Sequence, residues 1–139
     1  MGGLQVAVYR EDFTVESHRS KELLLITDEV ENVLRNSGIK AGICLVYTPH
    51  TTAAISINEA ADPDVRQDMI LGFNRLSPNS VQYSHKEGNS PAHLLASLIG
   101  PSESIPIIDG KLDLGVWQGI YFCEFDGPRV RKVYVQVLG

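Results

Sequence analysis

Three of the four histidines lie where they could act on one ligand. His50 follows an apolar run, His85 lies in a long polar stretch, and His93 comes near a helix start. Imidazole nitrogens commonly bind zinc and similar ions, and three of them leave a coordination position open for water or substrate. The spacing is not a specific motif, so the alternative is three unrelated polar side chains. His18 lies in a charged run and is expected at the surface.

Acidic residues are the candidates for proton transfer. Asn58 and Glu59 end an apolar run, and Asp62 then precedes Pro63 as the cap of a helix. Capping explains Asp62 but leaves Glu59 unexplained, so Glu59 is the better candidate for a general base or for a group that orients a metal ligand. Glu87, in the loop of His85, could reach the same site or be an ordinary solvated acid.

The C-terminal part adds aromatic, amide and cationic groups. Trp117, the only tryptophan, precedes Gln118. It could stack on a ring with Gln118 as a hydrogen-bonding neighbour, or simply pack in the core. Arg129 closes the turn Asp126-Gly127-Pro128-Arg129. Its planar guanidinium could bind a phosphate through two hydrogen bonds, or be an exposed turn residue.

The surrounding sequence predicts the elements that position these residues. Alternating or continuous apolar runs predict strands at 4–9, 13–16, 22–26, 42–47, 53–57, 104–108, 119–125 and 131–138. Capping signals predict three helices. The first starts at Thr27 and ends at Gly38, the second starts at Asp62, and the third runs from Ser90 to Ile99. The second helix should bury Val65, Met69, Phe73 and Leu76. Residues 77–90 form a loop, Asp109-Gly110 predicts a hairpin turn, and Gly115 indicates a bulge or a close backbone approach.

The composition restricts the class of protein. The chain has 139 residues, 43% of them hydrophobic and 21% charged, which fits one globular domain over 1–139. The mixture of strands and helices without regular βαβ units predicts an α+β fold. A net charge of −5 without a basic stripe argues against nucleic-acid and membrane partners. No leader or spanning segment is recognised, so a cytoplasmic location is expected. Cys44 and Cys123 lie in apolar runs and are expected to be buried free thiols.

Several segments, in this order, resemble the YjbQ-like family, also described as the secondary thiamine-phosphate synthase family. The matching segments cover about residues 40–139 and are Pro49 to Ala54, Ile57 to Pro63, Tyr83 to His93, Ser102 to Ile120, and Asp126 to Arg129. One departure is Val116, where the family usually has threonine. The loss of that hydroxyl would weaken binding if it contacts a ligand, whereas Val would replace its shape if it serves only the sheet.

The resemblance implies a mostly antiparallel sandwich-like fold, a homotrimer, and a metal site made by His50, His85 and His93. Zinc is the expected ion, and magnesium is the alternative with a pyrophosphate substrate. The implied activity, a secondary one in the family, joins hydroxymethylpyrimidine pyrophosphate to thiazole phosphate. Glu59 and Arg129, chosen from their positions in the chain, are the candidate catalytic residues. The candidate substrate-binding residues are Asn58, Glu87, Asn89, Trp117 and Gln118. The alternatives are a metal-dependent hydrolase and a metal-binding or small-molecule-binding module without turnover.

Overall fold

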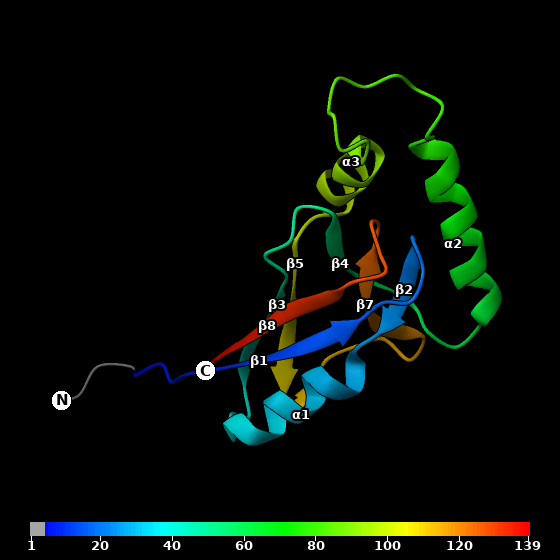
Figure 1. The fold of residues 1–139 in the computed structure, drawn as a ribbon. Coiled ribbons are helices and arrows are strands. Elements are labelled where there is room, and N and C mark those ends of the chain that lie inside the picture. The colour runs from blue at the N-terminus through cyan, green and yellow to red at the C-terminus, as the bar shows by residue number, and fades with distance from the viewer. Residues whose placement is uncertain (1–4) are drawn as a thin grey trace.

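Two antiparallel sheets form the body of the protein (Figure 1). The computed structural model describes residues 5–139. One sheet has five strands in the order β1-β8-β3-β5-β6, and the other has three in the order β2-β7-β4. The strands are β1 (Val8–Glu16), β2 (Glu22–Leu25), β3 (Gly42–Tyr47), β4 (Ala53–Glu59), β5 (Ser102–Ile108), β6 (Lys111–Leu112), β7 (Gln118–Glu124) and β8 (Val130–Leu138). The α+β fold is therefore confirmed.

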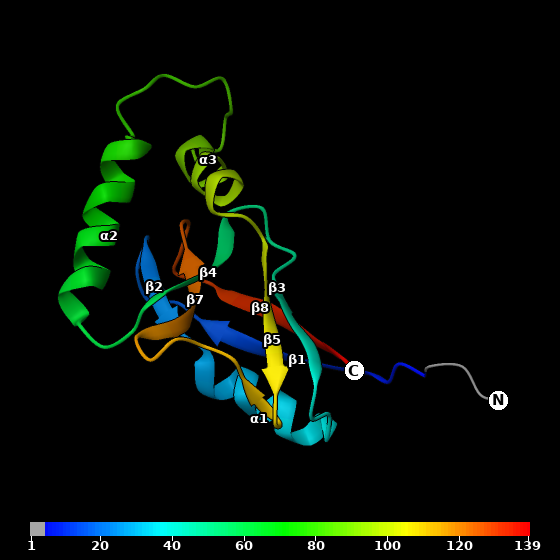
Figure 2. The same ribbon diagram turned by 180° about the vertical axis from the view of Figure 1, so that it is seen from behind.

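Three helices cover parts of these sheets: α1 (Thr27–Ser37), α2 (Pro63–Leu76) and α3 (Ser90–Ile99). Helix α1 contributes Val30, Val33 and Leu34 to the core between the sheets. Helices α2 and α3 lie on the other side of the three-stranded sheet, joined by the loop 77–89, and Figure 2 shows this arrangement from behind. Within residues 5–139, no helix is long and apolar enough to cross a membrane.

Side chains alternate along the strands of the three-stranded sheet and are thereby divided between two cores. Odd residues of β7 face the helices, where Tyr121 and Cys123 pack with Leu95 and Phe73. Even residues such as Phe122 face the larger sheet. Cys44 and Cys123 are buried and free, as predicted. Burial in apolar surroundings raises the pKa of Cys44 to about 11 and that of Cys123 to about 12, so both thiols remain protonated and unreactive at neutral pH.

Several local predictions are confirmed. The Asp62 carboxylate accepts a hydrogen bond from the Asp64 N–H at 2.9 Å, which caps α2. Gly38 ends α1 in the left-handed conformation with φ 69°. Asp109 and Gly110 both have positive φ, 52° and 76°, as a tight hairpin turn between β5 and β6 requires.

The prediction of two N-terminal strands was wrong. Residues 8–16 form one strand, because every residue of that span pairs with β8 despite the polar segment in its middle. The predicted start at Leu4 lies outside the described residues. The predicted buried face of α2 also extended too far along the helix. Phe73 is buried, but Leu76, at the helix end, is 71% exposed.

Two of the predicted helix caps, Thr27 and Ser90, do not cap their helices in the structure. The Thr27 hydroxyl accepts a hydrogen bond from the Ile120 N–H at 2.9 Å, which ties the start of α1 to β7. Asn89, rather than Ser90, stands before α3, and neither cap position of these two helices makes a side-chain capping bond. For Thr27 a tertiary hydrogen bond has replaced the local capping interaction, whereas the Asn89 side-chain oxygen accepts no hydrogen bond from the described residues.

Candidate functional site

A polar cavity of about 230 Å³ lies under the loop 77–89, where α3 begins. Two of the predicted substrate-binding residues, Glu87 and Asn89, line it, and Lys21 and Asp126 face them from other segments. The full lining is Ser20, Lys21, Asn79, Glu87, Gly88, Asn89, Pro91, Ala92, Phe125 and Asp126. The cavity therefore gathers carboxylates, amides and a lysine from three parts of the chain.

Hydrogen bonds between side chains connect one wall of this cavity. The Asn89 amide nitrogen donates to Glu87 Oε2 at 2.8 Å and to Asp126 Oδ2 at 2.9 Å. Arg129 donates to the same Asp126 oxygen through Nη2 and to the Asp126 carbonyl through Nε, both at 2.8 Å. Glu87 lies 3.8 Å from Arg129 Nη2. The predicted residues Glu87, Asn89 and Arg129 thus belong to one cluster, with Asp126 at its centre.

Asn89 leaves one group without a partner in this cluster. Its side-chain oxygen is buried and accepts no hydrogen bond from the described residues. An unpaired buried acceptor costs about 1–3 kcal/mol, so it favours a ligand or water that brings an N–H or O–H group. The cavity therefore presents an unfilled acceptor beside two carboxylates.

A buried polar network lies directly beneath the Arg129 turn. The Arg129 N–H donates to Ser17 Oγ at 2.8 Å, and Ser17 Oγ donates to Glu124 Oε1 at 2.7 Å. Glu124 also accepts from Arg131 Nε at 2.8 Å and from the Asp126 N–H at 3.1 Å. Arg131 also donates a hydrogen bond from Nη2 to the Thr52 hydroxyl at 2.9 Å. This network fixes the backbone that aims Asp126 and Arg129.

His50 lies beside this network and is held by the main chain. Its Nε2 accepts a hydrogen bond from the Lys132 N–H at 2.9 Å, so a neutral ring carries its proton on Nδ1. Burial is the main cause that lowers the pKa of His50, and the positive charges of Arg131 and Arg129 lower it further, against an opposing contribution from Glu124. His50 therefore favours its neutral form in the folded protein.

The structure brings two of the three predicted metal ligands together. The rings of His85 and His93 lie edge to face with centroids 5.6 Å apart. Within residues 5–139, no three His, Cys, Asp or Glu side chains gather closely enough to hold one ion. His50 fits that role poorly as placed, because a ligand nitrogen needs a free lone pair and the Nε2 lone pair is engaged. The three-histidine site stays a prediction. Within one chain, two of its three histidines, His85 and His93, lie together.

The remaining predicted residues lie at the opposite end of the three-stranded sheet. In β4, Asn58 and Glu59 pair with Gly119 and Gln118 of β7, whereas the Arg129 network begins beside Ala53. Glu59 lies six residue steps beyond Ala53 along the strand, which is about 20 Å at roughly 3.3 Å per residue. Within one chain, Glu59 therefore cannot take a proton from a group held at Arg129.

Trp117 belongs to this second group and is 63% exposed, so of its two interpretations the one that packs it in the core of this chain was wrong. Its carbonyl accepts from the Ala60 N–H at 2.8 Å, which fixes the backbone but leaves the indole ring free. Gln118 Oε1 accepts from the Gly115 N–H at 2.8 Å, so the group close to Gly115 is the Gln118 side chain and not another backbone segment. Val116 is 89% exposed, so the hydroxyl that it replaces would face outward from this chain.

Sequence reasoning missed the buried residues that hold the site. It assigned no role to Ser17, Glu124 or Arg131, although the two charged side chains are buried, at 0% and 3% exposure. A charged residue in an apolar strand was the available signal, because a buried charge requires a partner. The partner could not be identified from spacing alone.

The family described as UPF0047 protein YjbQ-like matches residues 11–139. The UPF0047 protein YugU of Bacillus subtilis is 47% identical over 126 residues, which cover 90% of this chain and 96% of that protein. A UPF0047 protein of Methanocaldococcus jannaschii is 46% identical over 127 residues, which cover 91% of this chain and 92% of the relative.

Solved structures share the fold. A YbjQ-like protein from Sulfolobus solfataricus superimposes with a TM-score of 0.94 at 38% identity, over 97% of this chain and 99% of that one. A YjbQ/UPF0047 family protein from Clostridium acetobutylicum gives a TM-score of 0.90 at 46% identity, over 91% of this chain and 98% of the other. The architecture of two sheets and three helices is therefore common to this chain and these proteins.

Proposed function

The chain belongs to the UPF0047 YjbQ-like family, and from that premise we propose that it is an enzyme acting on a phosphorylated small molecule at the cavity under the loop 77–89. The reaction proposed for the first test joins hydroxymethylpyrimidine pyrophosphate to thiazole phosphate. The resemblance motivates these substrates, and the charged groups around the cavity support a phosphorylated ligand.

The observation that carries the proposal is the orientation of Arg129. Its Nε and Nη2 are held by Asp126, while its Nη1 makes no hydrogen bond to the described residues. The side chain is 47% exposed, so a guanidinium fixed on one edge presents its other edge to solvent. Such a preorganised cation suits a phosphate, because little conformational entropy is lost when the ligand binds.

In the proposed reaction, a bond forms between the thiazole nitrogen and the methylene carbon of the pyrimidine substrate. The bond from that carbon to pyrophosphate breaks, and pyrophosphate leaves with the electron pair. Negative charge increases on the leaving oxygen, and Arg129 and Lys21 are the nearby cations that can stabilise it. Asn89 and Asp126 hold the guanidinium and the cavity wall in place.

A divalent ion, with zinc expected and magnesium as the alternative, remains part of the proposal. His85 and His93 would hold it, since their rings already lie together. When bound, such an ion supplies Lewis-acid stabilisation of phosphate oxygens.

The proposal also includes a homotrimer. Glu59 and Trp117 lie far along the sheet from Arg129 in one chain, so a single site that uses both groups needs a neighbouring copy. The outer face of the five-stranded sheet exposes apolar side chains suited to such packing: Ile43 at 49%, Tyr47 at 39%, Ile108 at 54% and Val130 at 66%. Light scattering should give about three times 15.3 kDa, and a monomeric mass at micromolar concentration would contradict this part of the proposal.

The decisive experiment supplies both substrates and measures thiamine phosphate and pyrophosphate separately. We expect equal amounts of the two products from the wild type and a large loss in Arg129→Ala. Arg35→Ala, which alters an exposed arginine in the last turn of α1, is the matched control and should retain activity. Phosphate or pyrophosphate release without the thiazole substrate would favour the hydrolase instead. Binding without any turnover would favour the non-catalytic module and contradict the enzyme proposal.

A further inference from the structure

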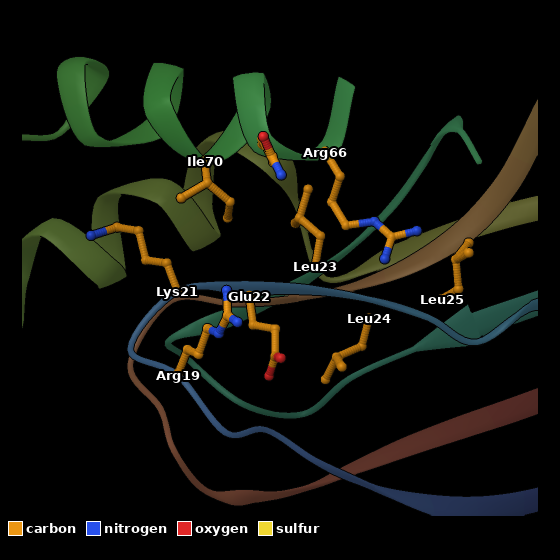
Figure 3. Close-up of a pocket in the computed structure, with 9 residues that line it drawn as sticks. Arg19, Lys21, Glu22, Leu23, Leu24, Leu25, Arg66 and Ile70 are labelled. Carbon is orange, nitrogen blue, oxygen red and sulfur yellow. The ribbon is translucent and has the colours of Figure 1, made fainter. Parts of the chain in front are cut away.

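A second cavity, of about 440 Å³, lies between strand β2 and helix α2 (Figure 3). The five consecutive residues 21–25 line it, although their side chains alternate between the two faces of the sheet. In Figure 3, Leu23 rises toward α2, whereas Glu22 and Leu24 point the other way. A cavity lined by both sets must run along the backbone edge of the strand. This cavity, the β2–α2 groove, therefore follows the open edge of the three-stranded sheet.

The hydrogen-bond pattern shows which main-chain groups face the groove. Strand β2 pairs only with β7, and the Ile26 N–H donates to the Ile120 carbonyl at 2.9 Å. Pairs in an antiparallel ladder alternate, so Leu24 and Glu22 also direct their main-chain groups toward β7. Leu23 and Leu25 then direct their N–H and C=O groups outward. Among the described residues, these groups have no hydrogen-bonding strand beside them.

Helix α2 supplies the other wall and an unpaired donor. Arg66 Nε is buried and donates to no acceptor among residues 5–139. The guanidinium carbon lies 5.4 Å from the centre of the Tyr121 ring, which holds the side chain over the groove. A buried donor without an acceptor costs about 1–3 kcal/mol. The position therefore favours a ligand that brings a carboxylate or another acceptor.

The charges of the groove differ in sign from those of the whole chain. Arg19, Lys21 and Arg66 line it with Glu22 as the one acid, and none of the three cations forms an ion pair with the described residues. The whole chain, by contrast, carries a net charge of −5. Ile70 and the leucines of β2 supply apolar surface between the cations. A complementary ligand thus combines negative charge, apolar groups and main-chain hydrogen-bonding groups.

We propose that the β2–α2 groove binds an extended acidic peptide segment of another protein, which adds to β2 as a further strand. Within the described part of the chain, the outward N–H and C=O groups of Leu23 and Leu25 have no hydrogen-bonding strand beside them. An extended peptide carries the alternating N–H and C=O groups that can pair with them. Its acidic side chains meet Arg66, Arg19 and Lys21, and its apolar ones meet Ile70. A small anion could satisfy Arg66 but would leave the strand edge unpaired, which is why the open edge favours a peptide.

The probe is a fluorescein-labelled eight-residue peptide of alternating valine and glutamate, measured by fluorescence polarisation. A second peptide with proline at alternate positions has the same charge but lacks half of the N–H groups. A third carries lysine in place of glutamate. We expect saturable binding of the first peptide, weakened by added salt, and at least tenfold weaker binding of the other two.

Two substitutions locate the binding site. Leu25→Pro removes an outward N–H that the sheet does not use, at a side chain that is 39% exposed, so the fold should persist. Arg66→Ala removes the unpaired donor. Each should weaken binding about tenfold or more, whereas Arg75→Ala, an exposed arginine in the last turn of α2 and outside the groove, should leave it unchanged.

Amide hydrogen exchange, measured on the wild-type protein, tests the binding site without relying on a variant that loses stability. The bound peptide should slow exchange at Leu23 and Leu25, and free glutamate at matched charge should not. Equal binding of the proline peptide, or full competition by inorganic phosphate, would overturn the proposal in favour of a small-anion site. A change of oligomeric mass in Leu25→Pro would instead identify another copy of this chain as the occupant, and would also overturn it.

Discussion

Glu124 and Arg131 form an ion pair with both side chains buried, directly beneath the turn that carries Arg129. Burial alone would raise the pKa of Glu124, but hydrogen bonds from Arg131, Ser17 and the Asp126 N–H more than offset it and lower the pKa. The carboxylate is therefore charged at neutral pH, and the pair with its hydrogen bonds fixes the turn.

Removing one partner of this pair should strongly destabilise the protein. Arg131→Met leaves a buried carboxylate without its main partner and should lower the free energy of unfolding by about 3–5 kcal/mol. The double variant Glu124→Gln with Arg131→Met should recover part of that loss, because no unpaired buried charge remains. Urea titrations of the two variants measure the difference. Equal destabilisation in both would show that packing, rather than charge pairing, dominates here.

Arg129→Ala should affect turnover far more than folding. The guanidinium is about half exposed, so its ion pairs with Asp126 and Glu87 contribute little to stability, within about 0.5 kcal/mol. Loss of a positioned cation at the leaving group should lower the rate by about 10²-fold. Arg129→Lys should retain only part of the wild-type rate, since a lysine cannot reproduce the two hydrogen bonds to Asp126. Pyrophosphate release and thermal unfolding, measured on the same preparations, separate the two effects.

Glu59→Gln tests whether the far end of the sheet takes part in catalysis. A general base or a metal-orienting acid contributes about 10²- to 10⁴-fold to the rate, whereas a half-buried acid with only a structural role contributes nothing to it. We expect loss of turnover in the trimer with unchanged thermal unfolding. If Glu59→Gln retains full activity while Arg129→Ala does not, the site is confined to the cavity under the loop 77–89.

His50 should make stability depend on pH. Its pKa is lowered in the fold, so the unfolded chain binds the proton more tightly. The stabilising contribution is therefore complete above the unfolded pKa of about 6.5, and it is lost as pH falls through the lower folded value. Thermal unfolding from pH 7.5 to 5 should show this decline. His50→Gln keeps an acceptor for the Lys132 N–H without titrating, and its curve should be flatter over the same range.

The zinc content of the protein and its variants tests whether His85 and His93 bind a metal ion. Purified protein dialysed against zinc should retain about one ion per chain, and His85→Ala or His93→Ala should each lose most of it. His18→Ala, at an exposed histidine, is the control. Loss of zinc in His50→Ala would show that His50 leaves Lys132 to complete the three-histidine site, whereas full retention would confine the ion to the pair. Chelation of the wild type should abolish turnover if the ion is catalytic.

The sequence by itself determined the elements and part of the site, because strand alternation, Asp62-Pro63, Gly38 and Asp109-Gly110 are local signals. It also identified Glu87, Asn89 and Arg129 as candidates. Only the tertiary structure joined these three through Asp126, since that contact spans 37 residues. The same holds for the network of Ser17, Glu124 and Arg131, which connects residues more than 100 positions apart. The separation of Glu59 and Trp117 from Arg129 was likewise decided by register along β4 and β7, because pairing of distant strands depends on long-range packing that no local pattern encodes.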